Sequence, residues 1–226
     1  MTTPRTPEGS NEPGMWDAYH ANPRAGVSAL NALKTAVVCH LFAARIRGLA
    51  GPFDSVLELG VGTASTLDVL ARYTGARAVG IDRSLPALEL ARARYPKLDL
   101  REGDLFDLAL EPASFDLVYS VGLLEHFSLA DQRRLLAIHA RHARKYVVLM
   151  TPGDGLLMNA ILFINRRVLG RTGVWADEDV FSERILRERF PGIPFEVRWD
   201  RHFGNLIVWF GFRPPDFRPG DHETQL

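Results

Sequence analysis

The sequence predicts an α/β fold whose strands are joined through helices. Residues 55–59 read as a short apolar strand, Gly60 and Gly62 form a turn, and residues 63–70 carry the apolar spacing of a helix. A strand, a glycine turn and a helix in this order make the first half of a βαβ unit. Further short apolar stretches follow between helical patterns, at residues 78–82, 98–101, 115–121 and 146–150.

The glycine turn suits a ligand that the backbone approaches closely. Glycine permits a tight turn and leaves out the Cβ that would block the ligand, and the helix start presents unpaired N–H groups. Two interpretations stay open for this stretch alone. A dinucleotide fingerprint has a third glycine, and this chain has Ser65 at that position. The second interpretation is a site for S-adenosylmethionine (SAM).

Acids at successive strand ends favour a ligand that contains adenosine. Asp82 ends the second strand, about 20 residues after the glycine turn, where a carboxylate can accept hydrogen bonds from both ribose hydroxyls. Arg83 follows directly and is a further candidate. Ser84 is available as the cap of the next helix, so Asp82 is not needed there. NAD and SAM share this ribose, so Asp82 alone does not separate them.

The combination of motifs resembles the class I SAM-dependent methyltransferases, of the kind that acts on small molecules. Glu58 stands two residues before Gly-x-Gly, as in the family's first motif, although Ala64 replaces a glycine frequent in the family. Residues 102–106 resemble the segment in which an acid, here Asp104, meets the adenine amino group and the next residue, Leu105, lies against the ring. Residues 115–127 resemble the family's fourth strand and its Leu-Glu-His helix start.

This resemblance implies a doubly wound, Rossmann-like sheet of seven mostly parallel strands, with SAM as the methyl donor and S-adenosylhomocysteine as the product. Glu58 is expected near the methionine end of SAM, and residues 120–123 are expected to border it. The implied cofactor-binding residues are Glu58, Gly60, Gly62, Thr63, Asp82, Arg83, Asp104, Leu105, Ser120 and Leu123.

His126 is the first candidate for a general base, because it lies just past the fourth strand and an unperturbed histidine titrates near neutral pH. A histidine that only bonds the backbone at a helix start is the structural alternative. Glu125, Tyr19 and His20 are the other catalytic candidates. Tyr19 and His20 belong to an aromatic cluster at residues 15–20, which either folds over the cofactor or anchors a helix to the core.

Several segments are predicted to be structural. Residues 28–47 read as a helix capped by Ser28, and Asp116 reads as a structural acid at the start of a strand. A helix from Ser128 to about residue 144 has the cap Ser128 with Asp131 in its first turn. Its cations are interpreted as a solvated face rather than a nucleic-acid patch: Arg133, Arg134, His139, Arg141, His142 and Arg144.

Residues 155–191 are predicted to be a helical insert after the fifth strand. Residues 156–164 are nearly all apolar, and three arginines follow them. Three interpretations stay open for this segment: a lid over a hydrophobic acceptor pocket, an interfacial or dimer helix, and a core helix. A helix is expected at residues 177–190, and the last two strands at 195–199 and 206–212, the final one antiparallel.

Composition limits the function. Lys and Arg total 27 and so do Asp and Glu, which gives no support to general binding of polyanions such as nucleic acid. The single cysteine, Cys39, excludes an internal disulfide and favours a reducing, cytoplasmic location. We find no secretory signal, no run long enough to cross a bilayer, and no residue spacing typical of a metal site.

The expected organisation is a disordered tail at residues 1–14, a helical cap at 15–52, a SAM-binding domain at 53–212 and a flexible tail at 213–226. The expected function is methyl transfer to an oxygen or nitrogen atom of a small, hydrophobic molecule, such as a secondary metabolite, by a monomer or homodimer. The alternatives are a SAM-binding fold used for cyclisation or rearrangement, a nicotinamide-dependent reductase, and a membrane-surface protein acting through residues 155–171.

Overall fold

A computed structural model describes residues 14–21, 39–46, 52–164, 167, 179–199 and 207–214. Its centre is a seven-stranded sheet in the order β3-β2-β1-β4-β5-β7-β6. The strands are β1 (Ser55–Leu59), β2 (Arg77–Asp82), β3 (Asp99–Glu102), β4 (Phe115–Val121), β5 (Ala143–Pro152), β6 (Glu196–Trp199) and β7 (Ile207–Phe212). Neighbouring strands from β3 to β5 are parallel, and β7 is antiparallel to both β5 and β6. The predicted doubly wound, seven-stranded, mostly parallel sheet is confirmed.

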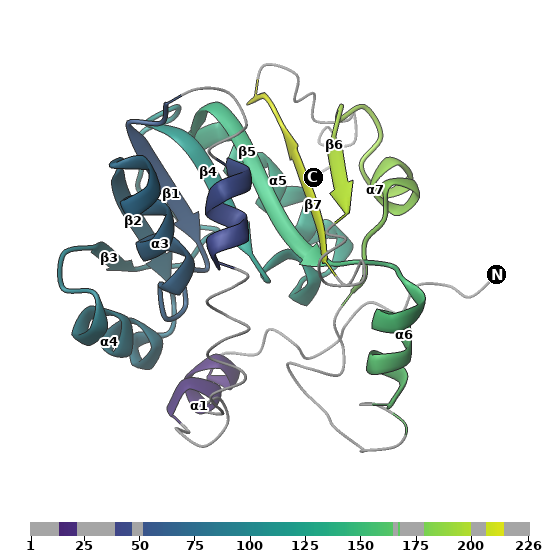
Figure 1. Ribbon diagram of the computed structural model, residues 1–226, viewed down its shortest axis with the longest axis horizontal. Helices are drawn as coiled ribbons and strands as arrows, with labels where there is room; N and C mark the ends of the chain where they lie inside the picture. Colours follow the sequence, from purple (N-terminus) through teal and green to yellow (C-terminus); the bar gives the residue numbers. More distant parts are fainter. Residues whose placement is uncertain are drawn as a thin grey trace.

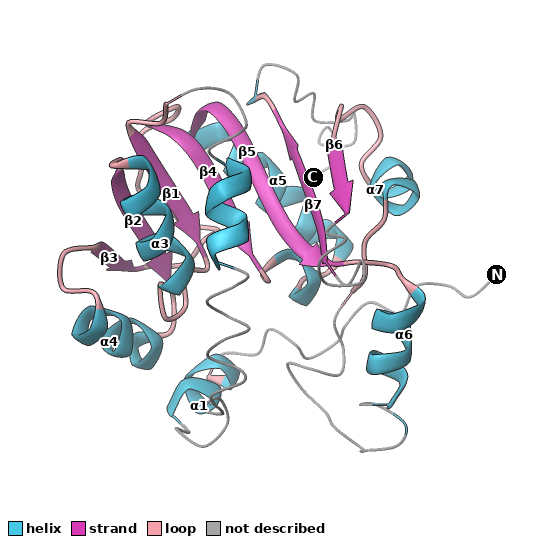
Figure 2. Cartoon of the chain, viewed as in Figure 1, coloured by secondary structure: helices cyan, strands magenta, loops and turns pink. Residues whose placement is uncertain are grey.

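Helices cover both faces of the sheet (Figure 1). The described helices are α1 (Met15–Ala21), the helix at 39–46, α3 (Ser65–Thr74), α4 (Leu85–Arg94), the 3-10 turn η1 (Leu124–His126), α5 (Leu129–His142), α6 (Leu156–Phe163) and α7 (Glu183–Arg189). Figure 2 shows the same layers, with α3 and the helix at 39–46 in front of the sheet and α5 behind it. The fold therefore buries the sheet from two sides.

Each face of the sheet has its own hydrophobic core. One core joins α3, α4 and the helix at 39–46 to the sheet, and Phe42 at its centre lies 5.0 Å from the ring of Tyr119 and 4.9 Å from that of Trp209. The other core joins α5 and α7 to the sheet through residues such as Leu135 and Leu186. Strands buried on both faces explain why the sequence reads as nearly continuous apolar runs there.

The two serine caps predicted at helix starts, Ser84 and Ser128, are confirmed. The Ser84 hydroxyl accepts a hydrogen bond from the Ala87 N–H, and the Ser128 hydroxyl accepts one from the Asp131 N–H. Gly75 ends α3 with φ 68°, a backbone conformation that glycine adopts without strain. These caps satisfy N–H and C=O groups that have no partner inside the helix.

Asp116 ties the start of β4 to the rest of the sheet. Its carboxylate accepts hydrogen bonds from the Asp54 N–H at 2.8 Å and from Arg144 at 2.6 Å, and Lys145 lies 3.2 Å away. Burial acts to raise the pKa of Asp116, but these donors and charges outweigh it and the pKa is lowered. The structure thus gives Asp116 the structural contacts predicted for it.

The predicted solvated face of the helix after Ser128 is partly wrong. The helix ends at His142, and Arg144 lies in β5, where its guanidinium bonds Asp116. His139 and His142 are buried rather than solvated. The ring nitrogens of His139 bond the Leu135 carbonyl at 2.7 Å and the Ser120 hydroxyl at 3.1 Å. Polar residues at buried positions of an amphipathic helix misled the sequence argument, because a histidine paired at both nitrogens tolerates burial.

The helix expected at residues 177–190 begins later than predicted. It runs from Glu183 to Arg189, because the Ser182 side chain caps it by accepting from the Ile185 N–H. Phe181, expected on a helical face, instead forms a β-bridge with Gly153 and is fully buried. Large apolar residues just before a cap imitate helical spacing, which explains the error.

Some predictions fall outside the described residues: the two tails apart from positions 14, 213 and 214, the cap Ser28 with the first part of its helix, and residues 165–166 and 168–178. Across the described ranges, no helix is both long enough and apolar enough to span a membrane.

Candidate active site

The turn after β1 is built from left-handed backbone. Gly60 has φ 70°, Gly62 has φ 49° and Ala64 has φ 59°. The N–H groups of Gly60 and Val61 both donate to the Ile81 carbonyl, at 2.9 and 3.0 Å. Two glycines allow this path without strain, whereas Ala64 adopts it with a Cβ present, which costs roughly 1–2 kcal/mol.

The turn lies directly against the end of β4. A Cβ on Gly60 would stand 2.7 Å from Cδ1 of Leu123, too close for any real contact. A Cβ on Gly62 would meet nothing within 4 Å. A Cβ at Gly60 would therefore displace the end of the Leu123 side chain as well as strain the backbone, whereas a Cβ at Gly62 would only strain the backbone. This contact joins the carboxyl ends of β1 and β4, where sheets of this kind bind ligands.

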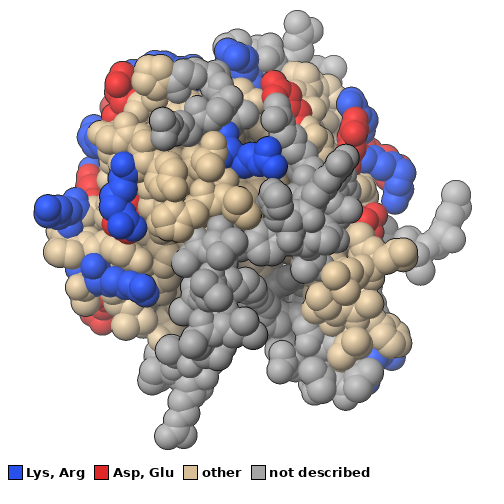
Figure 3. Space-filling model, viewed as in Figure 1, with Lys and Arg blue, Asp and Glu red and all other residues tan. Residues whose placement is uncertain are grey.

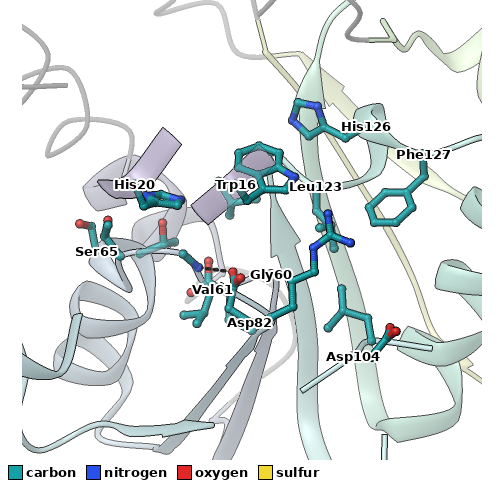
Figure 4. Close-up of a pocket in the computed structure, with 18 of the residues that line it drawn as sticks. Trp16, His20, Gly60, Val61, Ser65, Asp82, Asp104, Leu123, His126 and Phe127 are labelled. Carbon is teal, nitrogen blue, oxygen red and sulfur yellow. Dashed lines mark hydrogen bonds between the residues drawn. The ribbon is translucent and has the colours of Figure 1, made fainter. Parts of the chain in front are cut away.

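A cavity of ≈ 320 Å³ opens at this edge, within the range of about 300–1,000 Å³ typical of small-molecule sites. Figure 4 shows Trp16, His20 and His126 on one side of it and Asp82 and Asp104 on the other. The residues that line it come from α1, the glycine turn, the start of α3, the ends of β1, β2 and β4, the segment after β3, and η1 with its flanks. They are Trp16, His20, Glu58, Gly60, Val61, Gly62, Thr63, Ser65, Thr66, Asp82, Arg83, Asp104, Leu105, Phe106, Val121, Gly122, Leu123, His126 and Phe127.

Asp82 is fixed by two backbone donors at the end of β2. The Gly62 N–H donates to Oδ2 at 2.7 Å (Figure 4). The Ser84 N–H donates to Oδ1 at 2.9 Å. A carboxylate has about four acceptor positions, so roughly two remain for hydroxyls of a ligand. The same carboxylate thus orients the glycine turn and faces the cavity.

Glu58 is a buried acid below the turn. Glu58 and Tyr119 are opposite one another in the β1–β4 register, and the Tyr119 hydroxyl donates to Oε2 of Glu58 at 2.8 Å. Burial raises the pKa of Glu58 to about 8, the Tyr119 hydrogen bond opposes that rise, and the nearby charge of Asp82 adds to it. A pKa of about 8 favours the protonated form of Glu58 at neutral pH, and a positive charge beside the carboxyl would lower that pKa.

An apolar wall follows β3. Leu105 is buried, and the Phe106 ring packs edge-to-face on Phe127 with centroids 5.7 Å apart. The guanidinium of Arg134 lies over Phe106, 4.4 Å from the ring centre. The Phe106 N–H donates to Oδ1 of Asp104 at 2.9 Å, which orients that carboxylate at the edge of the wall. A flat aromatic group fits between such a wall and such an acceptor.

The opposite side of the cavity is aromatic. The Trp16 ring meets that of His126 edge-on at 5.0 Å and lies 6.3 Å from that of His20 in a stacked arrangement. Burial lowers the pKa of His126 to about 4, against a hydrogen bond to the Gly122 backbone that raises it. The expectation that His126 keeps an ordinary pKa is therefore wrong. Burial also lowers the pKa of His20, although Asp82 and Asp17 act against the shift.

Most of the predicted site residues meet at this cavity, two that the structure describes do not, and one has an undescribed side chain. Ser120 is buried behind it, where its hydroxyl bonds His139. Glu125 is also buried and does not line the cavity. Its backbone carbonyl accepts a hydrogen bond from the Asp179 N–H at 3.1 Å. Tyr19 lies in α1, but its side chain is outside the described residues.

Val121 and Gly122 line the cavity, as expected for residues 120–123. Sequence reasoning left out several other lining residues: Trp16, Val61, Ser65, Thr66, Phe106 and Phe127. A signal existed for Trp16, which belongs to the same aromatic cluster as His20. Phe106 and Phe127 read as ordinary core residues, and no pattern in the sequence separates them from the core. Within the part of the chain that the structure describes, no group of three or more His, Cys, Asp or Glu side chains is arranged to hold a metal ion.

Comparison with known proteins places this geometry in context. Residues 56–145 match the family model of a methyltransferase domain. A probable S-adenosylmethionine-dependent methyltransferase of Mycolicibacterium smegmatis is 37% identical over 82 residues, which are 36% of this chain and 31% of that protein. An uncharacterized methyltransferase of Anoxybacillus flavithermus is 30% identical over 142 residues, which are 62% of this chain and 63% of that protein. The chain thus spans from about a third to just under two thirds of the length of these relatives.

Solved structures share the fold. Magnesium protoporphyrin IX methyltransferase from Synechocystis, crystallised with bound S-adenosylhomocysteine, superposes with a TM-score of 0.63 at 15% identity, covering 88% of this chain and 92% of that one. A histamine N-methyltransferase candidate from Thermotoga maritima superposes with a TM-score of 0.61 at 17% identity, covering 88% and 99%. At this identity the likeness concerns the fold alone.

Proposed function

We propose that the chain is a class I SAM-dependent methyltransferase that transfers a methyl group to an oxygen or nitrogen atom of a small, hydrophobic molecule. The match of residues 56–145 to a methyltransferase domain supports this proposal. The observation that carries the proposal is the meeting of three acids around one cavity. Glu58, Asp82 and Asp104 stand at or just after the ends of β1, β2 and β3 and share the cavity with the glycine turn.

The side chains that line the cavity fit SAM. The remaining acceptor positions of Asp82 suit the two ribose hydroxyls, and Asp104 beside the wall of Leu105 and Phe106 suits an adenine with its amino group. Glu58 suits the ammonium group at the methionine end, since a positive charge there would favour its ionised form. When bound, SAM supplies a methyl group made electrophilic by its sulfonium.

The other side of the cavity suits the acceptor. Trp16, His20 and His126 form an aromatic boundary there, which favours an aromatic or otherwise hydrophobic molecule. With its pKa lowered to about 4, His126 is uncharged at neutral pH and can accept a hydrogen bond from a hydroxyl or amine. It is a weaker base than free histidine, so the protein contributes mainly alignment, a large catalytic term for a strong donor.

Calorimetric titration with SAM tests the site. Wild-type protein should bind SAM, and Asp82→Asn should weaken binding about tenfold or more, because it removes the charge that accepts from the ribose hydroxyls. Asp68→Asn is the matched control, since Asp68 lies on α3 and pairs with Arg72 outside the cavity. Absence of SAM binding in folded protein, or tighter binding of NADH than of SAM, would refute the proposal.

The acceptor class is tested separately. Protein with methyl-labelled SAM is incubated with phenols, alcohols and amines of graded hydrophobicity, and label in the product is counted. Transfer that rises with hydrophobicity is expected. If SAM binds but stays unconsumed while a substrate rearranges, the chain uses the same site for the non-methylating reaction. Label transfer that favours strongly polar acceptors would contradict the hydrophobic pocket.

A further inference from the structure

The ion pair between Asp179 and Arg189 is withdrawn from solvent. Figure 3 shows blue and red side chains mixed over the region of α7, and the pair of Arg187 with Glu183 on that helix has exposed side-chain fractions of 64% and 57%. For Arg189 and Asp179 these fractions are 15% and 17%. Two guanidinium nitrogens of Arg189 donate to the two carboxylate oxygens of Asp179, at 2.7 and 3.3 Å. Paired bonds of this kind fix the geometry of both groups, whereas exposed pairs contribute little.

Gln132 joins this ion pair to helix α5. Its side chain is fully buried, its Nε2 donates to Oδ2 of Asp179 at 2.8 Å, and its Oε1 accepts from Arg189 at 3.4 Å. The guanidinium of Arg189 also lies 5.6 Å from the ring centre of Phe181, whose backbone forms a β-bridge with Gly153 just after β5. We call Gln132, Asp179 and Arg189 the clamp. Its three side chains are fixed from α5, from α7 and from the end of the sheet.

The clamp binds the backbone on both sides of His126. The Nε2 group of Gln132 has two hydrogens, and it also donates to the Phe127 carbonyl, at 3.0 Å. The Asp179 N–H donates to the Glu125 carbonyl at 3.1 Å. Carbonyls at the end of a helical turn lack partners within the turn, so these two bonds determine where η1 lies. His126 stands between the two bonded carbonyls, and its buried ring lines the cavity.

We infer that Gln132, Asp179 and Arg189 are positioning residues, which hold His126 in place and thereby set the acceptor side of the cavity. None of the three lines the cavity, so they act on it only through the turn. The inference rests on the proposed function, which makes this the acceptor side, but the placement of His126 is measurable without SAM or an acceptor. If the same bonds only dock α7 on α5, losing them lowers stability and leaves His126 unchanged.

Histidine titration followed by NMR tests the clamp. Burial lowers the pKa of His126 to about 4, so its ring signal, identified by its absence in His126→Asn, should not titrate in wild type between about pH 5 and about pH 8. Gln132→Met keeps the side-chain length and removes both amide donors. The released carbonyl should admit water beside His126 and raise its titration by about one pH unit or more. Asp179→Asn should act in the same direction and serves as the second variant if Gln132→Met does not fold.

The matched control is Arg133→Ala. Arg133 also joins α5 to α7, because its guanidinium donates to the Arg189 carbonyl at 3.0 Å, but no described hydrogen bond connects it to η1. Its loss should lower the melting temperature and leave the titration of His126 as in wild type. The role in positioning is refuted if the clamp variants lower the melting temperature without moving that titration, or if Arg133→Ala moves it as far as they do.

Methyl transfer gives a second measurement. With labelled SAM and the phenol, alcohol or amine that wild type methylates fastest, kcat/KM should fall about tenfold in Gln132→Met and stay near wild type in Arg133→Ala, because displacing a group beside the acceptor spoils alignment. An equal fall in both variants would contradict the role of the clamp. If wild-type protein binds no SAM, the proposed function fails, and the NMR titration still decides whether the clamp holds His126.

Discussion

The Tyr119 hydroxyl donates a 2.8 Å hydrogen bond to Oε2 of Glu58, between two side chains that are both buried. The pair sits below the glycine turn and links β4 to β1. Because the donated hydrogen favours the ionised carboxyl, it limits a rise in the pKa of Glu58 that burial causes. The availability of a negative charge at the methionine end of the proposed site thus depends on a tyrosine outside the cavity lining.

Tyr119→Phe should weaken SAM binding about tenfold at neutral pH, because a hydrogen bond to a charged group is worth roughly 1.5–3 kcal/mol. The pKa of Glu58 should rise further, so the pH at which affinity increases should move upward. Titration calorimetry across a pH series measures both effects. Tyr146→Phe, which removes a buried hydroxyl from β5 away from the cavity, is the control. Equal affinities and pH profiles for Tyr119→Phe and wild type would contradict this role.

Glu58→Gln should change how stability depends on pH. The pKa of Glu58 is raised from 4.5 to about 8 by folding, so the folded protein holds a proton that the unfolded chain has already released. The contribution of Glu58 to the unfolding free energy is fully present below pH 4.5 and is lost as the pH rises through about 8. The glutamine of the variant does not titrate, so the variant does not lose this contribution to the unfolding free energy as the pH rises.

Urea unfolding at about pH 5 and about pH 9 measures the unfolding free energies of both proteins. The unfolding free energy of Glu58→Gln relative to wild type should be higher at about pH 9 than at about pH 5 by a few kcal/mol, to order of magnitude. Glu102→Gln, at an exposed position, is the control and should show no comparable change. If the relative stability moves the other way with pH, the carboxyl is ionised in the folded protein.

Gly60→Ala and Gly75→Ala separate the cost of a left-handed backbone from the cost of a steric clash. The two positions have nearly equal φ, 70° and 68°, but a Cβ meets Leu123 at Gly60 and nothing within 4 Å at Gly75. Gly75→Ala should cost about 1–2 kcal/mol for the left-handed backbone alone, and Gly60→Ala should cost more. Adding Leu123→Ala should recover the excess at Gly60 only, which a double-mutant cycle of unfolding free energies measures. No coupling between positions 60 and 123 would show that the contact is relieved in another way.

Ala64→Gly should leave the stability nearly unchanged. Relief of the left-handed φ of 59° gains roughly 1–2 kcal/mol. The greater freedom of glycine in the unfolded chain, about 0.5–1 kcal/mol, and the loss of a fully buried methyl group, about 0.8 kcal/mol, offset this gain. The melting temperature should stay within about 2 °C of wild type. Ala71→Gly, inside α3, is the control and should lower it. A lower melting temperature for Ala64→Gly would mean that the alanine methyl group contributes more packing than strain.

The sheet was largely predictable from the sequence, because its central strands β1, β2, β4 and β5 contain short apolar runs. Ser84 and Ser128 mark helix starts by a mechanism that acts within one turn, and both are confirmed. Two of the errors concern long-range pairing. Arg144 reads as the end of a helix until its partner Asp116, 28 positions away, is known, and His139 reads as exposed until Ser120 is placed beside it.

The candidate site also has a part that the sequence predicts and a part that it does not. The acids at strand ends lie where the topology of parallel strands puts them, so Glu58, Asp82 and Asp104 could be named from their positions. The pKa of His126 could not be inferred, because its value depends on how completely Trp16 and other neighbours exclude water. Desolvation is a property of the packed molecule, and no local pattern in the sequence records it.

The position of β7 has a consequence for biosynthesis. β7 pairs with β5 on one side and β6 on the other, so the edge of β5 is covered only by residues 207–212, which leave the ribosome after all other described strands. Until then a nascent chain holds every residue of the cavity but presents a long, apolar strand edge able to pair with another molecule. Truncation before residue 207 should therefore yield a protein that aggregates rather than one that merely loses activity.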